Sequence, residues 1–247
     1  MRYFIEIAYD GTPFHGWQRQ PNAISVQEVL EQALSMLLRK DVGLTGAGRT
    51  DAGVHARQLY AHFDFEELID REHIAFRLNR YLPESIAING IHKMNKDAHA
   101  RFDAVSRSYE YHLSTEKNPF QTNRSYLFEK PLDINAMQEG ADMLLGRKDF
   151  KCFSRSKTDV NTYICEIKKA AWEEHGNMLV FSICADRFLR NMVRAIVGTL
   201  IEIGLKKLTL DALQNIILSQ DRSEAGASVP AHGLYLTQVT YPKSIFI

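Results

Sequence analysis

The sequence predicts an α+β fold built from two consecutive halves. Patterns typical of strands and helices follow one another in the first half of the chain and again in the second. No glycine- or serine-rich linker, repeat or low-complexity tract interrupts them. The chain has 247 residues, 45% hydrophobic and 24% charged, which suits one large or two small globular domains. We expect the junction at 103–107 and the domains at 1–104 and 105–247.

Three strands and two helices are predicted in the N-terminal half. Apolar and aromatic runs predict the strands Arg2–Tyr9, Gln58–Phe65 and Ile86–His92. A capping box formed by Ser25 and Glu28 predicts the start of the first helix, since the serine hydroxyl can accept from the amide of residue 28. Helical spacing predicts a core-facing side made of Val26, Val29, Leu30, Ala33, Leu34, Leu37 and Leu38. The second helix is predicted at Glu67–Tyr81, before Pro83.

The C-terminal half is also predicted to contain both strands and helices. Strands are predicted at Arg107–Ser114, Tyr163–Trp172, Met178–Cys184 and Leu234–Tyr241, the middle two joined as a hairpin. Helices are predicted at Asp133–Leu145, Phe188–Ile203 and Thr209–Leu218. Asp133 is a typical N-cap, and Gly146 and Gly204 follow two of the helices as helix-ending residues.

Cysteine use and the N-terminus indicate a cytoplasmic protein. The three cysteines, Cys152, Cys165 and Cys184, form no C-x-x-C pair, which favours reduced thiols. The apolar run at the N-terminus carries charges, so it predicts a strand and not a signal peptide. No apolar run has the length of a membrane span, and the nine histidines lack metal-ligand spacing. We therefore expect no membrane contact and no metal.

The charge of the chain is balanced, with a net value of zero. This counts against a generic nucleic-acid binder, although the distribution of charge matters more than its sum. Basic residues gather at 147–169 and 186–207. They are Arg147, Lys148, Lys151, Arg155, Lys157, Lys168 and Lys169, then Arg187, Arg190, Arg194, Lys206 and Lys207. Each group forms either an ordinary solvated face or a local phosphate-binding surface.

The segment 46–58, GAGRTDAGVHARQ, is the strongest candidate for a catalytic loop. It places Asp51 among three glycines, which let backbone approach a ligand closely. Arg49 and Arg57 flank the carboxylate and supply planar donors suited to phosphates and bases. A dinucleotide fingerprint would need a third glycine at position 51, and no Gly-Lys-Ser/Thr follows for a P-loop. A structural turn, in which Asp51 only accepts from backbone amides, remains the alternative.

Several blocks of the sequence resemble the tRNA pseudouridine synthase A family (the TruA family). Residues 48–56, GRTDAGVHA, are similar to its active-site motif. The other blocks follow in the family's order: YDGTPFHGWQ at 9–18, SVQ at 25–27, HARFD at 99–103, RSYEY at 107–111, FLRNMVRAIVG at 188–198 and HGLYL at 232–236.

The resemblance implies two ferredoxin-like halves that share an extended, mostly antiparallel mixed sheet with a central active-site cleft. It implies an isomerase that converts uridine to pseudouridine in the anticodon stem-loop of tRNA, at tRNA positions 38 to 40. It further implies no cofactor, tRNA as the partner, and a homodimer. Two rival functions are a tRNA-folding chaperone without catalysis and a nucleotide-dependent transferase. The chaperone predicts loss of the family's site residues, and the transferase needs a phosphate loop.

The resemblance also assigns residue roles. Asp51 is the catalytic carboxylate, either a nucleophile or a stabiliser of a developing sugar cation. Tyr109 stacks on the extruded base, and its hydroxyl can move a proton. Arg107, Tyr109 and Tyr111 share one strand face by alternation, and we interpret Tyr111 as a core residue.

Arg194 resembles the family's basic partner of the catalytic aspartate. Together with Arg187 and Arg190 it is expected to form one stripe of the predicted helix, opposite the core-facing Leu189, Val193, Ile196 and Leu200. Arg49 is implied as a phosphate or backbone contact that assists base extrusion. Leu234 is implied as the apolar residue against which the base packs.

Overall fold

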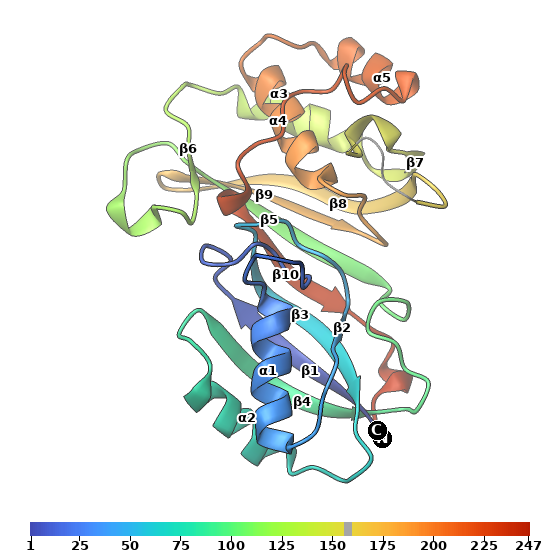
Figure 1. Ribbon diagram of the computed structural model, residues 1–247. Helices are drawn as coiled ribbons and strands as arrows, with labels where there is room; N and C mark the ends of the chain where they lie inside the picture. Colours follow the sequence, from blue (N-terminus) through green and yellow to red (C-terminus); the bar gives the residue numbers. More distant parts are fainter. Residues whose placement is uncertain (156–159) are drawn as a thin grey trace. The chain divides into compact units, whose positions relative to one another are not determined.

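The computed structural model describes residues 1–155 and 160–247. Contacts within the chain divide it into two compact units, which Figure 1 shows as a ribbon. The N-terminal unit comprises Met1–Val105 and Tyr235–Ile247, and the C-terminal unit comprises Ser106–Leu234. Lys157, one of the basic residues singled out in the sequence, lies outside the described residues.

The N-terminal unit contains a sheet with the strand order β4-β1-β3-β10, and β2 pairs with β3 at its side. The strands are β1 (Arg2–Tyr9), β2 (Thr45–Gly46), β3 (His55–Asp64), β4 (Ile86–Met94) and β10 (Leu234–Thr240). β1 runs antiparallel to both β3 and β4. β10 runs parallel to β3 and pairs with it at His55 and Ala56. This parallel pair explains why residues 235–247 group with the N-terminal unit, whereas we expected them in a domain 105–247.

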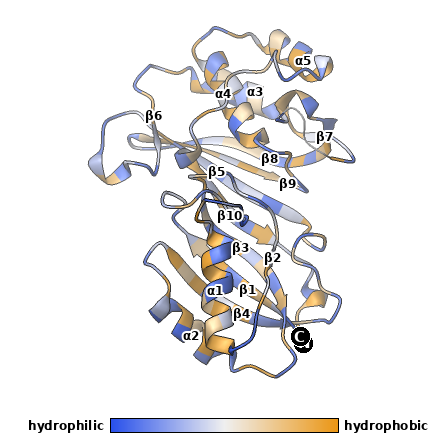
Figure 2. Ribbon diagram, viewed as in Figure 1, coloured by the Kyte–Doolittle hydropathy of each residue, from blue (hydrophilic) through white to orange (hydrophobic). Residues whose placement is uncertain are grey.

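Two helices cover one face of this sheet, α1 (Val26–Leu38) and α2 (Arg71–Tyr81). Tyr3, Ile5 and Ile7 alternate along β1 and are fully buried. The predicted cap of α1 is confirmed, because Ser25 Oγ accepts from the Glu28 amide at 3.3 Å. Figure 2 shows hydrophobic and hydrophilic residues side by side within the helices, as amphipathic packing on a sheet requires.

The second helix begins later than predicted. Asp70 caps α2 by accepting from the His73 amide at 3.0 Å, so the helix starts at Arg71 and not at Glu67. β3, in contrast, begins three residues earlier than the predicted Gln58. Its start at His55 brings the strand directly up to the glycine-rich loop.

In the C-terminal unit the strands of the sheet follow the order β5-β9-β8-β7, and β6 pairs with β5. Its strands are β5 (Ser106–Ser114), β6 (Tyr126–Leu127), β7 (Gly146–Asp149), β8 (Ile164–His175) and β9 (Met178–Ala185). The predicted hairpin is confirmed as β8 and β9, which pair antiparallel. The helices are α3 (Ile134–Asp142), α4 (Met192–Gly204) and α5 (Leu210–Ser219), with Asp133 capping α3 as predicted.

The start of α4 corrects the prediction of a helix from Phe188. The helix begins at Met192, because Asn191 takes a left-handed conformation with φ 66°. Arg187 and Arg190 therefore precede the helix and do not form a helical stripe with Arg194. Of the predicted apolar side, Val193, Ile196 and Leu200 lie on α4 and are buried, whereas Leu189 is buried but precedes the helix.

Among the described residues, no helix has both the length and the apolar character that crossing a bilayer requires.

Candidate active site

Asp51 lies in the loop between β2 and β3 of the N-terminal unit. The loop is fixed at both ends by backbone hydrogen bonds. The Ala47 amide donates to Tyr60 O at 2.7 Å, and the Val54 amide donates to Asp51 O at 3.2 Å. Asp51 is half-buried and Arg49 is exposed. The carboxylate is therefore held on a short, ordered turn with one guanidinium two residues away.

The segment 9–17 holds this loop from the other side. Tyr9 Oη and Thr50 Oγ1 are 2.8 Å apart, and the Trp17 amide donates to Thr50 O at 3.2 Å. Tyr9 and Trp17 are 5% and 2% exposed, so both anchors are inside the protein. The residue next to Asp51 is thus bound through its side chain and its carbonyl at once.

Two glycines allow the backbones to approach so closely. A Cβ on Gly16, whose φ is +87°, would lie 2.4 Å from Thr50 O. A Cβ on Gly11 would lie 2.1 Å from Val54 O. Any side chain at either position would push the Asp51 loop away.

His55 completes the support at the start of β3. Its Nδ1 accepts from the Gly11 amide at 3.0 Å and lies 3.1 Å from Asp10 Oδ1. Its ring stacks on Tyr235 with centroids 4.6 Å apart, and the Arg57 guanidinium lies over the same tyrosine at 5.4 Å. His55 is 3% exposed, so it orients the loop from within the protein.

Sequence reasoning missed the positioning role of these residues. It used the block 9–18 only as a mark of resemblance, although Gly11 and Gly16 were visible there beside Tyr9 and Trp17. Two glycines among aromatic residues indicate a close backbone approach, but nothing in the sequence names the segment that is approached.

Tyr109 lies on β5 in the C-terminal unit. It is half-buried, and its ring meets Phe188 edge to face with centroids 5.1 Å apart. Tyr111 is fully buried, and its hydroxyl donates to Pro230 O at 2.8 Å. Burial raises the pKa of the Tyr111 hydroxyl above its ordinary value. The interpretation of Tyr111 as a core residue is confirmed.

Arg194 lies in the first turn of α4 and is half-buried. Its Nε donates to Val229 O at 2.7 Å, and the Val229 amide donates back to Arg194 O at 3.2 Å. The guanidinium therefore has a defined direction. Arg107 Nη1 similarly donates to Asp186 O at 2.9 Å, and Leu234 is 6% exposed.

The candidate residues thus fall into two groups. Asp51, Arg49 and Arg57 belong to the N-terminal unit, whereas the C-terminal unit carries Tyr109, Arg107, Arg194 and Leu234. The pairing of Asp51 with Arg194, beside Tyr109, stays a prediction.

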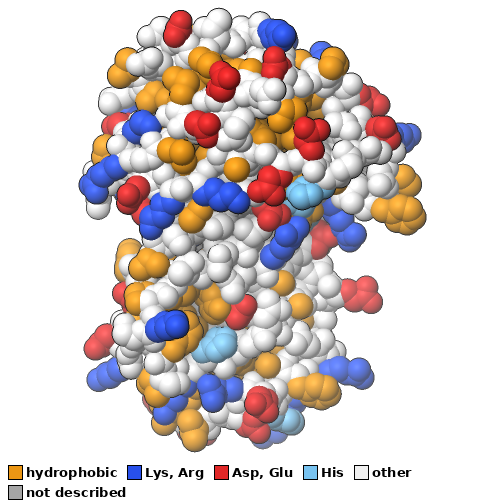
Figure 3. Space-filling view, turned by 180° about the vertical axis from the view of Figure 1, so that it is seen from behind, with side chains coloured by type: hydrophobic (Ala, Val, Ile, Leu, Met, Phe, Trp, Pro, Cys, Tyr) orange, Lys and Arg blue, Asp and Glu red, His pale blue; other side chains and the backbone are white. Residues whose placement is uncertain are grey.

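Some basic residues singled out in the sequence have structural roles. Lys148 Nζ donates to Met143 O at 2.8 Å and to Leu145 O, and burial lowers the pKa of its ammonium group. It therefore stabilises the carbonyls that follow α3. Lys169 pairs with Glu173 at 3.5 Å. Figure 3 shows Lys and Arg side chains interspersed with Asp and Glu on the visible face of each unit.

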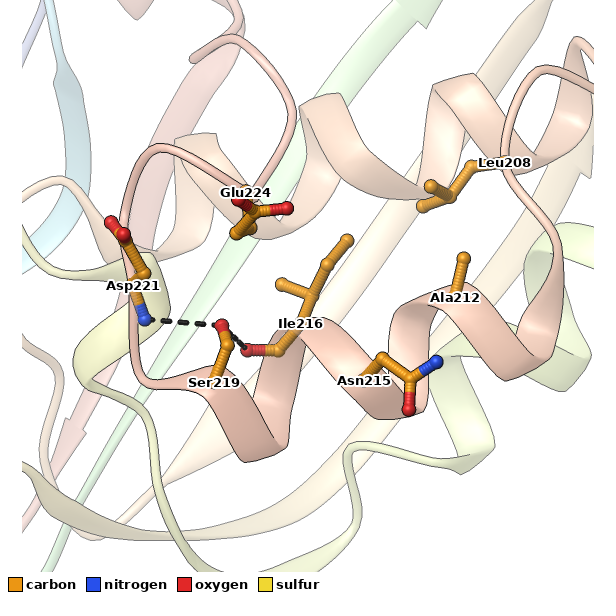
Figure 4. A pocket seen from close by; sticks show the side chains of 7 residues that line it. All are labelled: Leu208, Ala212, Asn215, Ile216, Ser219, Asp221 and Glu224. Carbon is orange, nitrogen blue, oxygen red and sulfur yellow. Dashed lines mark hydrogen bonds between the residues drawn. The ribbon is translucent and has the colours of Figure 1, made fainter.

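A cavity of about 420 Å³ lies beside α5, and Figure 4 shows its lining. The lining residues are Leu208, Ala212, Asn215, Ile216, Ser219, Asp221 and Glu224. The two charged side chains in this lining, Asp221 and Glu224, are carboxylates, so the cavity does not suit an RNA phosphate. None of the candidate site residues lines it. Among the described residues, no group of three or more His, Cys, Asp or Glu side chains could hold a metal ion.

Comparison with known proteins identifies the class of protein to which this mixed α/β chain belongs. A family model described as tRNA pseudouridine synthase matches residues 6–103 and 141–242. The matched ranges include Asp51, Arg194 and Leu234, while Tyr109 falls between them. The chain belongs to the tRNA pseudouridine synthase family.

Close relatives carry the name tRNA pseudouridine synthase A. One from Parabacteroides distasonis is 51% identical over 99% of this chain and 98% of its own length. One from Bacteroides fragilis is 52% identical with the same coverage, and one from Acetivibrio thermocellus is 40% identical over 95% and 97%. This membership makes the chain an isomerase that acts on tRNA.

Proposed function

We propose that the protein converts uridine to pseudouridine in the anticodon stem-loop of tRNA, at tRNA positions 38 to 40. The observation that carries this proposal is the Asp51 loop, anchored from two sides, in a chain that matches pseudouridine synthases over nearly its whole length. The reaction breaks the N-glycosidic bond, turns the uracil and rejoins it through carbon. It transfers no electrons and no phosphate.

Asp51 is the catalytic group of this proposal. Its carboxylate acts either as a nucleophile that traps the intermediate or as a stabiliser of a developing sugar cation. Both roles need an ionised carboxylate in a fixed direction. The hydrogen bonds to Thr50 and the close approach of Gly11 and Gly16 hold the backbone that carries this carboxylate. Arg194 is proposed as the cation that pairs with this carboxylate.

Tyr109 is proposed to stack on the extruded uracil. A uridine within a stem-loop must leave its stack before a side chain can reach it, and the free base then needs a flat partner. The edge-to-face contact with Phe188 fixes the plane of the Tyr109 ring. Its hydroxyl is proposed to move the proton that changes position during isomerisation.

The remaining residues bind the substrate in this proposal. Arg49 is exposed beside Asp51 and suits a phosphate of the extruded nucleotide. Arg57 and Arg107 are both held in place, the first over Tyr235 and the second on Asp186 O, so they present guanidinium groups with little loss of entropy. Leu234 supplies an apolar contact. We also propose a homodimer in the cytoplasm, so that one tRNA contacts both subunits.

Incubation with an unmodified tRNA transcript, followed by chemical mapping of pseudouridine, tests the function. We expect modification at positions 38 to 40 and none in a transcript whose uridines there are replaced by cytidine. Asp51→Asn keeps the size and most hydrogen bonding but removes the charge. We expect it to abolish single-turnover isomerisation while tRNA affinity stays within about twofold. Isomerisation by Asp51→Asn at the wild-type rate would exclude Asp51 as the catalytic group.

A further inference from the structure

The turn at 98–103, between β4 and β5, belongs to the N-terminal unit and has no part in the proposed chemistry. It carries the HARFD block of the sequence. Phe102 is 73% exposed at this turn, and Arg101 beside it is exposed too. A single exposed phenylalanine needs no explanation by itself. This phenylalanine, however, is held in a fixed position by the turn that carries it.

Hydrogen bonds within the turn fix its shape. The His99 amide donates to Asp103 Oδ2 at 2.7 Å, and the Asp103 amide donates to His99 O at 3.1 Å. His99 Nδ1 accepts from the Arg101 amide at 3.1 Å and from the Phe102 amide at 3.4 Å. The backbone at Arg101 and Phe102 is therefore held by hydrogen bonds to the imidazole of His99.

Three further hydrogen bonds attach the turn to the sheet. Arg2 Nη1 donates to Ala98 O at 2.8 Å, and the Ala100 amide donates to His62 Nδ1 at 3.1 Å. The Tyr241 hydroxyl donates to Ala100 O at 2.6 Å. Since β1, β3 and the chain after β10 each contribute one bond, the turn is fixed to the body of the unit and does not behave as a loose loop.

The side chains form a ring pair with a guanidinium over the Phe102 ring. The His99 ring lies 4.3 Å from the Phe102 ring at 33°, and His62 meets His99 edge to face at 4.6 Å. One face of Phe102 is thus backed by imidazole, while most of its surface is in water. The Arg101 guanidinium carbon lies 5.6 Å from the Phe102 ring centre. A rigid aromatic face beside a guanidinium suits a nucleotide, whose base stacks while its phosphate meets the cation.

We propose that Phe102 and Arg101 form a stacking platform for an unpaired nucleotide of the tRNA, separate from the uridine that reacts. This proposal rests on tRNA being the substrate. The base stacks on the exposed face of Phe102, and the guanidinium of Arg101 moves from the ring to the adjoining phosphate. Because the turn is already ordered, binding loses little backbone entropy.

Binding of an unmodified tRNA transcript, together with kcat and KM, tests the platform. Phe102→Ala should weaken tRNA binding roughly tenfold and raise KM in proportion, with kcat unchanged, since a base–aromatic stack is the interaction removed. Phe102→Trp should keep wild-type affinity, because it keeps a flat ring. Phe120→Ala is the matched control: Phe120 is 83% exposed on the short 3-10 turn Pro119–Gln121 of the C-terminal unit, and its loss should change nothing.

Arg101→Gln should lower the slope of log Kd against log salt by about 1, which corresponds to the loss of one phosphate contact.

Equal affinity of Phe102→Ala and wild type for tRNA, at equal melting temperature, would overturn the platform. So would a Phe102→Ala chain that loses self-association in sedimentation while its tRNA affinity stays unchanged, since Phe102 would then contact a second copy. A wild type that makes no pseudouridine but binds tRNA through Phe102 would refute the proposed function and leave the platform standing.

Discussion

Tyr109 has two separable contributions in the proposed reaction, its flat ring and its hydroxyl. Tyr109→Phe keeps the ring and the contact with Phe188, so we expect tRNA affinity to stay and kcat to fall. Tyr109→Leu removes the stack as well, which contributes on the order of 1–3 kcal/mol, and should impair both binding and turnover. Stopped-flow binding and single-turnover rates separate the two effects. Wild-type turnover by both variants would show that Tyr109 only packs in the unit.

His62 links folding stability to pH. It is 7% exposed, and burial, followed by the charges of Arg2 and His99, lowers the pKa of its ring to about 4. The unfolded chain, with a histidine pKa near 6.5, binds this proton more readily. The free energy of unfolding should therefore fall as pH drops from about 6.5 to 4. Protonation would also remove the acceptor that His62 Nδ1 offers to the Ala100 amide.

Urea unfolding at several pH values tests this, with His62→Gln for comparison. Glutamine can accept the same amide but does not titrate, so its stability should depend less on pH in this window. Asp64 and Asp103 also face His62, but their titration is common to both proteins and cancels in the comparison. If the free energy of unfolding depended on pH equally in wild type and His62→Gln, His62 would not be the source of that dependence.

The elements that sequence predicts well are those that local chemistry decides. β1 occupies the predicted residues because its apolar run is unambiguous, and α1 starts where Ser25 can cap it. The start of α4 could not be predicted in this way. Asn191 Nδ2 donates to Ser228 Oγ at 2.5 Å, 37 residues away, and this distant contact accompanies the left-handed turn that precedes the helix.

The packing of the segment 9–17 against the Asp51 loop gives a prediction about an element that touches no substrate. In Gly11→Ala the new methyl group would lie 2.1 Å from Val54 O, which is backbone and cannot swing aside. The loop must shift, and a misplacement of about 1 Å can cost on the order of 100-fold in rate. We expect kcat to fall while tRNA binding changes little.

Gly43→Ala is the matched control, because a Cβ there meets nothing within 4 Å. It should keep wild-type kcat and melting temperature. Overpacking at Gly11 should also destabilise the unit by about 1–3 kcal/mol. If Gly11→Ala kept full kcat, the close approach of the two backbones would have no part in placing Asp51.

The sequence could nominate candidate site residues because they stand in short motifs. Asp51 stands out among glycines and arginines, and Tyr109 by its place in the RSYEY block. What supports these residues was not found, because Tyr9, Gly11 and Trp17 act on a loop some 40 positions away. Sequence patterns indicate which residue types are unusual, whereas long-range packing decides what they touch.

The proposed pairing of Asp51 with Arg194 joins the two halves of the chain in one function, and stability measurements can test it. If the guanidinium neutralises the carboxylate, Arg194→Gln strands a negative charge in addition to losing the bond to Val229 O. In an Asp51→Asn background no charge is stranded, so the same substitution should cost less. We expect a coupling free energy of about 0.5–3 kcal/mol in a double-mutant cycle measured by urea unfolding. Arg190→Gln, an exposed arginine just before α4, should give additive effects with Asp51→Asn. Additivity for Arg194→Gln as well would show that Arg194 does not pair with Asp51, and Arg194 would then be only a support for the segment around Val229.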